Sequence, residues 1–346
     1  MIFYIILFFI ALFFSFIYTY TKEKNIAFIS KSMLFLVLFL PLALRKDIGT
    51  DYKNYVRIFN EMSSGIKSSQ EVGWQFINYI VIKLHLNVQW IFIISAFLTV
   101  FFILRTPKKE LFITVILFFC LFYLESYTMV RQALAMSICW YSFLCFNKGM
   151  KKRAILFLII AISFHYAAIL VAFAFIFMNQ YKLSEKAFYI LLAFSFIFVE
   201  SGLLLKVMTF MLSFTKYGIY LSRSDLFANL VSGGIGGLAT FSVRSSILIG
   251  MYCFLPESVN EKQKSYCRIC VLCLFLFDLL GVNVYIFQRV RVYFFLSYMV
   301  VFYFLYNQKN GVKKSANIIF IAFFVVYYMI MKLITGSGQI VPYMHI

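Results

Sequence analysis

Charged residues are scarce in this chain: only 13% of its 346 residues are Asp, Glu, Lys or Arg, and just 13 of them are acidic. Proline (4) and histidine (3) are also rare, and no polar stretch is long enough to fold as a separate globular domain. A soluble domain carries about 25% charged residues and roughly 45–50% apolar ones. The scarcity of charge therefore excludes an ordinary soluble protein.

Apolar side chains fill the space that charge leaves, since 63% of the residues are hydrophobic and 45 are Phe. Runs long enough to cross a bilayer as helices, roughly 17–25 residues each, recur along the chain. We expect an all-α, polytopic integral membrane protein that forms a single membrane domain over 1–346. It should have ten to eleven transmembrane helices, short loops, and interfacial or re-entrant helices. The predicted spans are 2–20, 26–44, 88–105, 111–125, 130–147, 154–178, 187–212, 241–255, 269–288, 292–306 and 316–334.

The formal net charge of +19 comes from cations in short loops between the spans, at 21–25, 105–109, 147–153, 260–268 and 307–314. Cytoplasmic loops of membrane proteins carry an excess of Lys and Arg, so this pattern predicts a membrane orientation and no nucleic-acid partner. The polar segments 45–87, 213–240 and 335–346 then lie on the outer face. The first run has no cationic segment before it and no small-residue cleavage site, which favours a retained helix over a signal peptide.

The number of crossings between loops 147–153 and 213–240 must be odd for this orientation to hold. Two full crossings, by 154–178 and 187–212, would give the wrong parity. Either 154–178 is interrupted around His165 and returns as a broken hairpin, or 187–212 is split at "ESG" (200–202). Irregular backbone at membrane depth is tolerated only where protein or a water-filled cavity covers it, so such a break would mark a cavity.

The 7 cysteines lie mostly inside apolar runs. In "CRICVLC", Cys267, Cys270 and Cys273 are three residues apart, a spacing that also stacks side chains along one side of a helix. Buried small hydrophobes are the favoured interpretation. The histidines are scattered and no carboxylates pair at ligand spacing, so the sequence predicts no metal site and no cofactor.

The densest polar element is "LRKDIGTDYKNYVRIF" (44–59). Thr50 is a plausible N-cap with Asp51 in the first helical turn. Apolar and polar side chains then separate onto two faces: Tyr52, Tyr55, Phe59 and Met62 on one, Lys53, Arg57 and Glu61 elsewhere. Two interpretations stay open: an amphipathic helix on the outer surface, or a site in which Arg45 and Asp51 meet a lipid headgroup. Segment 74–86 is predicted to be an interfacial helix with its Trp and Tyr at headgroup level.

A few other ionisable residues lie in or beside spans, where they are energetically expensive and tend to mark sites. Arg131 and Gln132 begin one span, and an ion pair of Arg131 with Glu125 is the simplest structural explanation. His165 lies within a span and has only Ser163 and Tyr166 as polar neighbours, and Asp278 is a lone acid expected to face another helix. Arg289 and Arg291 would anchor to phosphate headgroups or bind a diphosphate bidentately.

Several short motifs occur in a characteristic order: an arginine followed by "TDY-x2-Y-x3-F" (Arg45 to Phe59), then "EVGWQFINYI", "VRQALAMSI", "FHYAAIL", "RVRVYFF" and "VPY". This order resembles the EpsG family, which belongs among the Wzy-type polysaccharide polymerases, and the resemblance runs from about residue 30 to the end. The segment "RVRVYFF" has an extra arginine compared with the family, so either Arg289 or Arg291 is the matching position.

The resemblance implies a metal-independent glycosyltransferase of the bacterial cytoplasmic membrane that joins polyprenyl-diphosphate-linked oligosaccharides at its outer face. The product would be a surface polysaccharide such as capsule, O-antigen or exopolysaccharide; a chain-length regulator and a flippase are candidate partners. Arginines would stabilise the departing diphosphate, and either His165, which we favour, or Asp51 would accept the acceptor's proton. The catalytic candidates are His165, Asp51, Arg131 and Arg289; the substrate-binding candidates are Arg45, Tyr52, Tyr55, Gln132, Arg291 and Tyr293, with Trp74 and Tyr127 as further sugar-stacking rings.

Two other classes remain as alternatives. A membrane-bound O-acyltransferase also uses a histidine among apolar spans, but acyl transfer does not obviously need the outer arginines or the "GTDY" element. A transporter of lipid-linked oligosaccharides would be expected to show internal repeats, and the sequence has none of fixed period.

Overall fold

The computed structural model describes residues 1–203, 206–207, 210, 213–214, 234–283, 285–306 and 311–345. Within these ranges the chain is all-helical, as expected, and the one β-bridge is an isolated pair between Arg45 and His345. The chain forms two compact units, which we describe separately. Unit 1 comprises Met1–Leu170 and Ile318–Ile346, and unit 2 comprises Val171–Asn317.

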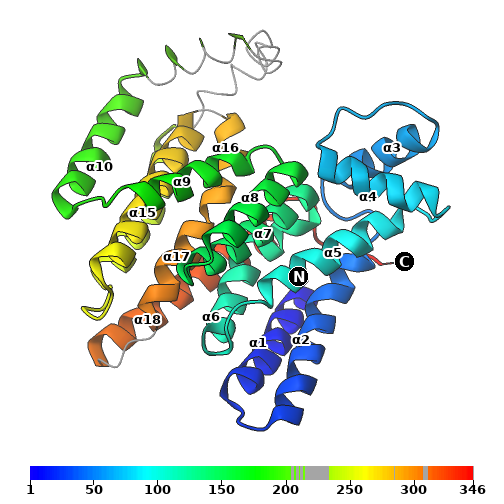
Figure 1. Ribbon diagram of the computed structural model, residues 1–346, viewed down its shortest axis with the longest axis horizontal. Helices are drawn as coiled ribbons and strands as arrows, with labels where there is room; N and C mark the ends of the chain where they lie inside the picture. Colours follow the sequence, from blue (N-terminus) through cyan, green and yellow to red (C-terminus); the bar gives the residue numbers. More distant parts are fainter. Residues whose placement is uncertain are drawn as a thin grey trace. The chain divides into compact units, whose positions relative to one another are not determined.

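Unit 1 contains the first ten helical elements of the chain and the last three (Figure 1). They are α1 (Ile2–Tyr20), α2 (Lys24–Ala43), α3 (Tyr52–Ser63), α4 (Val72–Lys83), α5 (Gln89–Ile103), α6 (Lys108–Phe118), η1 (Phe119–Tyr123), η2 (Glu125–Tyr127), α7 (Val130–Asn147), α8 (Lys151–Phe164), α18 (Gly311–Phe323), η5 (Phe324–Ile330) and α19 (Met331–Thr335). The chain passes between the units within α18 and within α9 (Ala168–Gln180). Helices that follow one another through short turns, such as α1 and α2 or α7 and α8, pack side by side.

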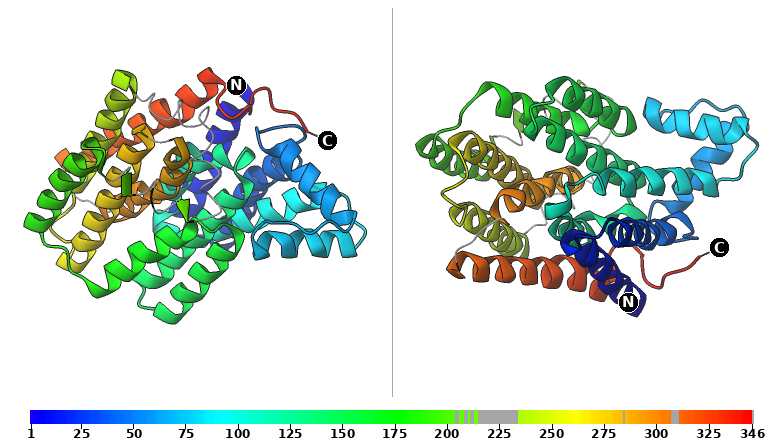
Figure 2. Two further views of the ribbon diagram at one scale, coloured as in Figure 1. Left: turned by 90° about the horizontal axis from the view of Figure 1, so that it is seen from above. Right: turned by 60° about the horizontal axis from the view of Figure 1, so that its bottom comes forward.

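The loops of unit 1 gather at two opposite helix ends. At the first, which we call the basic end (loops 21–23, 104–107 and 148–150), Lys108 Nζ donates to Thr21 O at 2.6 Å, and Trp140 Nε1 donates to Thr106 Oγ1 at 2.8 Å. The second, the polar end, comprises turns 44–51 and 124–129, the break 165–167 and the C-terminal tail 336–345. Figure 2 shows the tail, in red, next to the blue segment that follows α2. By the positive-inside rule the basic end is expected on the cytoplasmic side, and this orientation stays a prediction.

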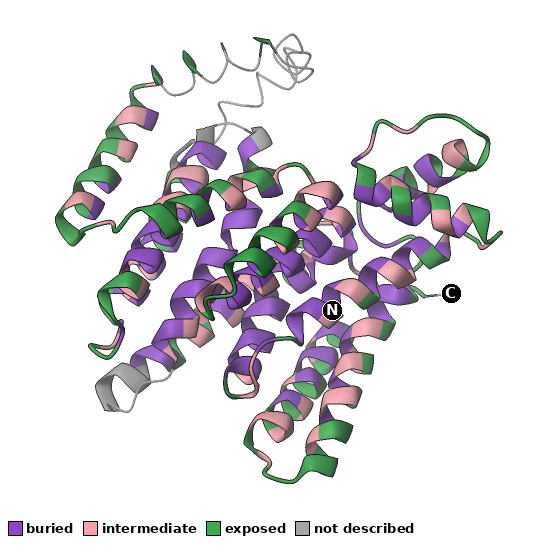
Figure 3. Cartoon of the chain, viewed as in Figure 1, coloured by how far each residue is buried: buried purple, intermediate pink, exposed green. Residues whose placement is uncertain are grey.

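Large apolar side chains remain exposed on the outside of unit 1. On α1 they recur every three or four residues, at Ile2, Ile6, Phe9, Phe13, Phe16 and Tyr20, and so form one stripe along the helix. Figure 3 shows the exposed positions along α1 and α2 beside a buried interior. In water such a stripe would be unfavourable; in a bilayer it is the surface that faces the lipid tails.

Unit 2 is built from most of α9, α10 (Glu185–Glu200), α14 (Gly234–Cys253), α15 (Glu261–Asn283), α16 (Tyr285–Phe294) and α17 (Leu296–Leu305). α15 packs against α10, α14, α16 and α17 and is the central helix of the unit. Its surroundings explain why two of the three cysteines predicted to be buried are so: Cys267 and Cys270 are 0% and 6% exposed, whereas Cys273 is only half-buried.

Four of the described helical segments are long and apolar enough to cross a membrane: Ile2–Tyr20, Lys24–Ala43, Glu261–Val282 and Ala316–Thr335. Three shorter apolar helices, Gln89–Ile103, Ala168–Gln180 and Leu238–Cys253, accompany them. These segments agree with a membrane protein, and the count of ten to eleven spans stays a prediction.

Some predicted boundaries were wrong. Residues 261–268, predicted as part of a basic loop, form the start of α15, because Asn260 and Gln263 form a capping box: each backbone N–H bonds to the other's side chain, at 3.3 and 3.0 Å. α14 starts at Gly234, inside the predicted outer loop 213–240; residues 215–233 of that loop lie outside the described residues.

Helix breaks occur at both places that the parity argument singled out. α8 ends at Phe164 and α9 begins at Ala168, so the predicted span 154–178 is interrupted at His165. α10 ends at Glu200, and Gly202 follows in a turn with φ of +71°.

Candidate functional site

Arg45, at the start of the polar turn 44–51, is a buried cation rather than an exposed one. Its side chain is 2% accessible, and its Nη1 donates to Ser126 O at 2.8 Å. The guanidinium lies over the rings of Phe92 and Tyr127, with 4.7 and 5.7 Å to their centroids. Burial lowers the pKa of Arg45 to about 10, so the group stays protonated at neutral pH. Arg45 therefore holds the turn 44–51 against the turn 124–129.

The C-terminal tail completes the polar end through backbone hydrogen bonds to turn 44–51. Gly49 N donates to Gln339 O at 3.1 Å, Thr50 N to Gly338 O at 3.2 Å, and Lys46 N to Met344 O at 3.1 Å. Gly338 O also accepts from Thr128 Oγ1 at 2.9 Å. Hydrogen bonds thus tie together three segments that are far apart in the sequence, and the tail bonds to turn 44–51 through its backbone and to Thr128 through that residue's hydroxyl.

Helix α3 shows the predicted two-faced pattern with two differences. Tyr52, Tyr55 and Phe59 are buried and Lys53 and Arg57 are exposed, as expected. The helix begins at Tyr52, so the cap position is Asp51 rather than Thr50, and the Asp51 side chain makes no capping hydrogen bond.

The apolar face of α3 packs on protein rather than on a membrane surface. The Tyr52 ring stacks on Phe92 at 4.9 Å, and the Tyr55 ring lies 5.2 Å from Trp74. Burial raises the pKa values of both tyrosines. Trp74 and Tyr127, proposed as sugar-stacking rings, are each 0% exposed, so the Trp74 ring is covered by protein and has no surface left for a lipid headgroup. None of these four rings offers an open face to a sugar in this structure.

Arg131 pairs with Glu71, not with Glu125 as expected. Its Nη1 donates to Glu71 Oε2, and the side chains of Arg131 and Glu71 are 19% and 10% exposed. The other carboxylate oxygen of Glu71 accepts from Tyr166 N at 3.4 Å. Glu125 pairs with Lys332 of α19 instead. The Arg131–Glu71 pair brings the first turn of α7, the start of α4 and the break after α8 to one place.

His165 and Gln132 are next in sequence to residues of this cluster, since His165 precedes Tyr166 and Gln132 follows Arg131. His165 is half-buried and follows the last residue of α8, with extended backbone at φ of −157°. Gln132 is buried, at 4% exposure, in the first turn of α7. Of the predicted site residues, seven belong to unit 1 and lie in the turns of the polar end or in the first turn of the helix that follows one: Arg45, Asp51, Tyr52, Tyr55, Arg131, Gln132 and His165.

The remaining predicted residues, Arg289, Arg291 and Tyr293, belong to α16 of unit 2. Arg289 is exposed and Tyr293 is fully buried. Arg291 Nη1 donates to Asp278 Oδ1 at 3.2 Å, and Arg244 of α14 holds both oxygens of the same carboxylate at 2.6 and 2.7 Å. Asp278 thus faces its neighbouring helices, as expected. Arg244 precedes it in the sequence and Arg291 follows it.

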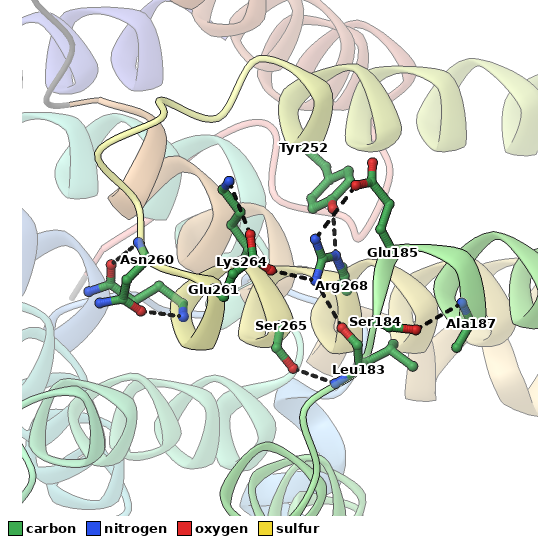
Figure 4. Close-up of polar contacts among 11 residues, drawn as sticks. Leu183, Ser184, Glu185, Ala187, Tyr252, Asn260, Glu261, Lys264, Ser265 and Arg268 are labelled. Carbon is green, nitrogen blue, oxygen red and sulfur yellow. Dashed lines mark hydrogen bonds and ion pairs between the residues drawn. The ribbon is translucent and has the colours of Figure 1, made fainter.

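A second buried arginine of unit 2 is structural in its contacts (Figure 4). Arg268 of α15 donates to Tyr252 OH at 2.6 Å, to Leu183 O at 2.9 Å and to Glu261 Oε2 at 3.2 Å. Leu183 N in turn donates to Ser265 Oγ at 2.8 Å. These bonds fasten the turn between α9 and α10 to the helix pair α14–α15.

The sequence interpretation missed Glu71, Lys332, Arg244 and Arg268. Apart from Glu261, which shares α15 with Arg268, their partners are 16 to 207 residues away on other elements, so no local spacing reveals these pairs. The scarcity of acids was the available signal: with only 13 Asp and Glu in the chain, each one beside a span has a strong chance of neutralising a cation.

The fold and this site define a helical membrane protein with a charged cluster at the ends of its helices. The chain belongs to the EpsG family, whose model matches residues 28–345. This confirms the resemblance seen in the motifs, and the family is associated with polysaccharide polymerisation. Comparisons with curated proteins and with solved structures give no match.

Proposed function

We propose that this protein is a Wzy-type polymerase of the bacterial cytoplasmic membrane that joins oligosaccharide repeat units carried on polyprenyl diphosphate. The observation that supports this best is the charged cluster of Arg131, Glu71 and the helix break at His165, in a chain whose family match spans nearly its whole length. Family membership supports polysaccharide polymerisation, and the cluster supports chemistry on an anionic, lipid-linked substrate.

In the proposed reaction an acceptor hydroxyl attacks the anomeric carbon of the donor glycan. A new C–O bond forms, the bond from that carbon to the diphosphate oxygen breaks, and polyprenyl diphosphate leaves with the electron pair. The acceptor's proton passes to a base on the protein. Negative charge grows on the leaving group, so the reaction needs a cation held in place before the step begins.

Arg131 suits the cationic role. It begins a helix, its direction is fixed by an ion pair with Glu71, and 19% of its side chain remains exposed for a ligand. Arg45 is less suited to direct contact, because it is sealed beneath Phe92 and Tyr127. We assign Arg45 to holding the polar end together, and Arg289, which is exposed, to the lipid diphosphate.

His165 or Asp51 is the proposed base. A neutral imidazole can accept a proton at neutral pH, and histidine is the side chain that most often acts as a general base. Asp51 is half-exposed at the start of α3, and His165 is half-buried beside the residue that contacts Glu71. This comparison favours His165.

The decisive experiment supplies purified protein in lipid vesicles with lipid-linked repeat units alone. A polymerase converts these units into a ladder of products that differ by one repeat each. Unchanged units would instead point to a transporter, and a requirement for an acyl donor would point to an O-acyltransferase; either result overturns the proposal.

A further inference from the structure

We infer that Glu71 is a positioning residue of the polymerase site: its carboxylate fixes Arg131 and the break at His165 relative to each other. The inference rests on the proposed function for its catalytic consequence. Its geometric basis does not depend on that function, because it consists of two hydrogen bonds in the structure. Both are made within unit 1.

The two oxygens of Glu71 have different partners, one on a helix and one in a helix break. Oε2 accepts from Arg131 Nη1 in the first turn of α7. Oε1 accepts from Tyr166 N, in the break that separates α8 from α9. A single planar carboxylate therefore sets the separation between the guanidinium proposed to bind diphosphate and the backbone next to the proposed base.

The contact with Tyr166 N acts on the break itself. Tyr166 lies two residues before α9, and the first amides of that helix are already bonded, because Ala168 N donates to His165 O and Ile169 N to Tyr166 O, both at 3.0 Å. Glu71 instead supplies the acceptor for an amide within residues 165–167, next to His165.

Glu71 is itself held firmly. Two residues later, Gly73 lies so close to α8 that a Cβ atom would come within 2.8 Å of Ser163 O. The next residue, Trp74, is fully buried beside the ring of Tyr55. Because α4 is fixed against both α3 and α8 on either side of this position, the carboxylate has little freedom to follow its partners.

The substitutions Glu71→Gln and Glu71→Ala separate the two contacts. Glutamine keeps an oxygen for Tyr166 N but loses the charge opposite Arg131, whereas alanine loses both. Glu61→Gln is the matched control, because Glu61 forms an exposed ion pair with Arg57 on α3 at 2.5 Å. Each variant is assayed in vesicles for kcat and for KM with the lipid-linked donor, for thermal stability, and for amide hydrogen exchange of the peptide around Tyr166.

We expect Glu71→Gln to lower kcat by roughly 10²-fold, the effect of misplacing a reacting group by about 1 Å, with KM near the wild-type value. Exchange at Tyr166 should stay slow in Glu71→Gln and become fast in Glu71→Ala. Glu61→Gln should match the wild type in every measurement.

The outcomes distinguish this inference from the function on which it rests. If the wild-type protein forms a ladder and Glu71→Gln keeps its kcat, the positioning role is wrong and the polymerase stands. A kcat that falls only together with thermal stability also overturns positioning. If the wild-type protein makes no ladder, the polymerase is wrong, and exchange at Tyr166 still tests Glu71: unchanged exchange in Glu71→Ala overturns its role at the break.

Discussion

Arg45 illustrates how the polar end of unit 1 can hold a cation away from water. No carboxylate among the described residues forms an ion pair with it, and its charge is met by Ser126 O and by the faces of two aromatic rings. Desolvation makes such burial costly, and attraction to aromatic rings recovers part of that cost. The residue is therefore better placed to fix three segments than to bind a substrate.

Removing the Arg45 side chain should destabilise the protein more than removing an exposed arginine. Arg45→Ala leaves a cavity between two rings and an unpaired carbonyl, at a cost of about 3 kcal/mol. Arg57→Ala, which breaks only the exposed pair with Glu61, should cost at most about 1 kcal/mol. Thermal unfolding of the two variants in detergent measures the difference, and equal unfolding temperatures would contradict the structural role.

Gly49 offers a sharper comparison at the residue scale. Gly49 and Gly65 both have positive φ, of +92° and +84°, so an alanine is strained at either position. A Cβ at Gly49 would also lie 2.1 Å from Tyr127 O, whereas nothing lies within 4 Å at Gly65. We expect Gly65→Ala to lower stability by about 1 kcal/mol and Gly49→Ala to prevent normal accumulation of folded protein, as judged by fluorescence-detected size-exclusion chromatography. Similar profiles for both variants would show that Gly49 does not contact the turn 124–129.

The proposed phosphate-binding arginines give a functional prediction. Arg131→Ala and Arg289→Ala should each reduce polymer by roughly 10²–10³-fold, the range found when one preorganised stabilising group is removed, and leave single repeat units on the lipid. Gel analysis of surface glycan in a deletion strain carrying each variant measures this. Polymer of wild-type length in both variants would defeat the assignment.

At the scale of elements, the C-terminal tail is the part of the molecule that local sequence patterns could not place. Its hydrogen bonds reach turn 44–51 and turn 124–129, and Tyr4 OH of α1 donates to Ile340 O at 2.7 Å. Tyr343 stacks on Phe3 at 4.0 Å and donates to Pro41 O at 3.1 Å. The tail therefore closes the polar end instead of extending from it.

Ending the chain after Thr335 should expose the turn that the tail covers. Lys46, whose backbone N–H is bonded to Met344 O, should then become a site of rapid trypsin cleavage. Cleavage in the loop that carries Lys22 and Lys24, at the basic end, is the internal reference and should proceed at an unchanged rate. Resistance of the truncated protein at Lys46 would mean that the tail does not hold this turn.

Helical type and the two faces of α3 were predictable because they depend on periodicity within one segment. The side-chain spacing at Tyr52, Tyr55 and Phe59 is fixed by the helix itself. The residues that cover that face were not predictable, because Phe92 and Trp74 come from other helices, α5 and α4. The same limit applied to the site: Arg131 was recognisable as an unusual cation, but its acid, Glu71, lies 60 residues earlier.

Boundaries failed where polar side chains stabilise a helix end. The segment that starts at Asn260 is rich in Lys and Gln, and its charge indicated a loop. Reciprocal hydrogen bonds between Asn260 and Gln263 instead start α15 there. Arg268, which was predicted to lie in the loop, is therefore buried within the helix. A search for capping pairs ahead of an apolar run would have found this start.

At the scale of the whole molecule, charge and apolar surface agree on how unit 1 lies in a membrane. Lys22 and Lys148 lie in the loops of the basic end, and Lys24, Lys108 and Lys151 begin the helices that follow these loops. The stripe of exposed side chains on α1 runs between the two ends. A bilayer whose cytoplasmic face meets the basic end satisfies both features. The polar end, with Arg131 and Glu71, then faces outward, where lipid-linked repeat units are proposed to be joined.

Cysteine labelling tests this orientation and the proposed role of Arg289. In a background without the exposed Cys253, Asn60→Cys on α3 and Arg289→Cys on α16 should react with a membrane-impermeant maleimide in intact cells, because both positions are exposed and predicted to be outside. Lys22→Cys, exposed at the basic end, should react only after permeabilisation. The proposed reaction needs Arg131 and Arg289 on one side of the membrane, since one diphosphate cannot be reached from both. Labelling of positions 60 and 289 from opposite sides would therefore remove Arg289 from the site, whereas labelling of positions 22 and 60 from the same side would overturn the orientation of unit 1.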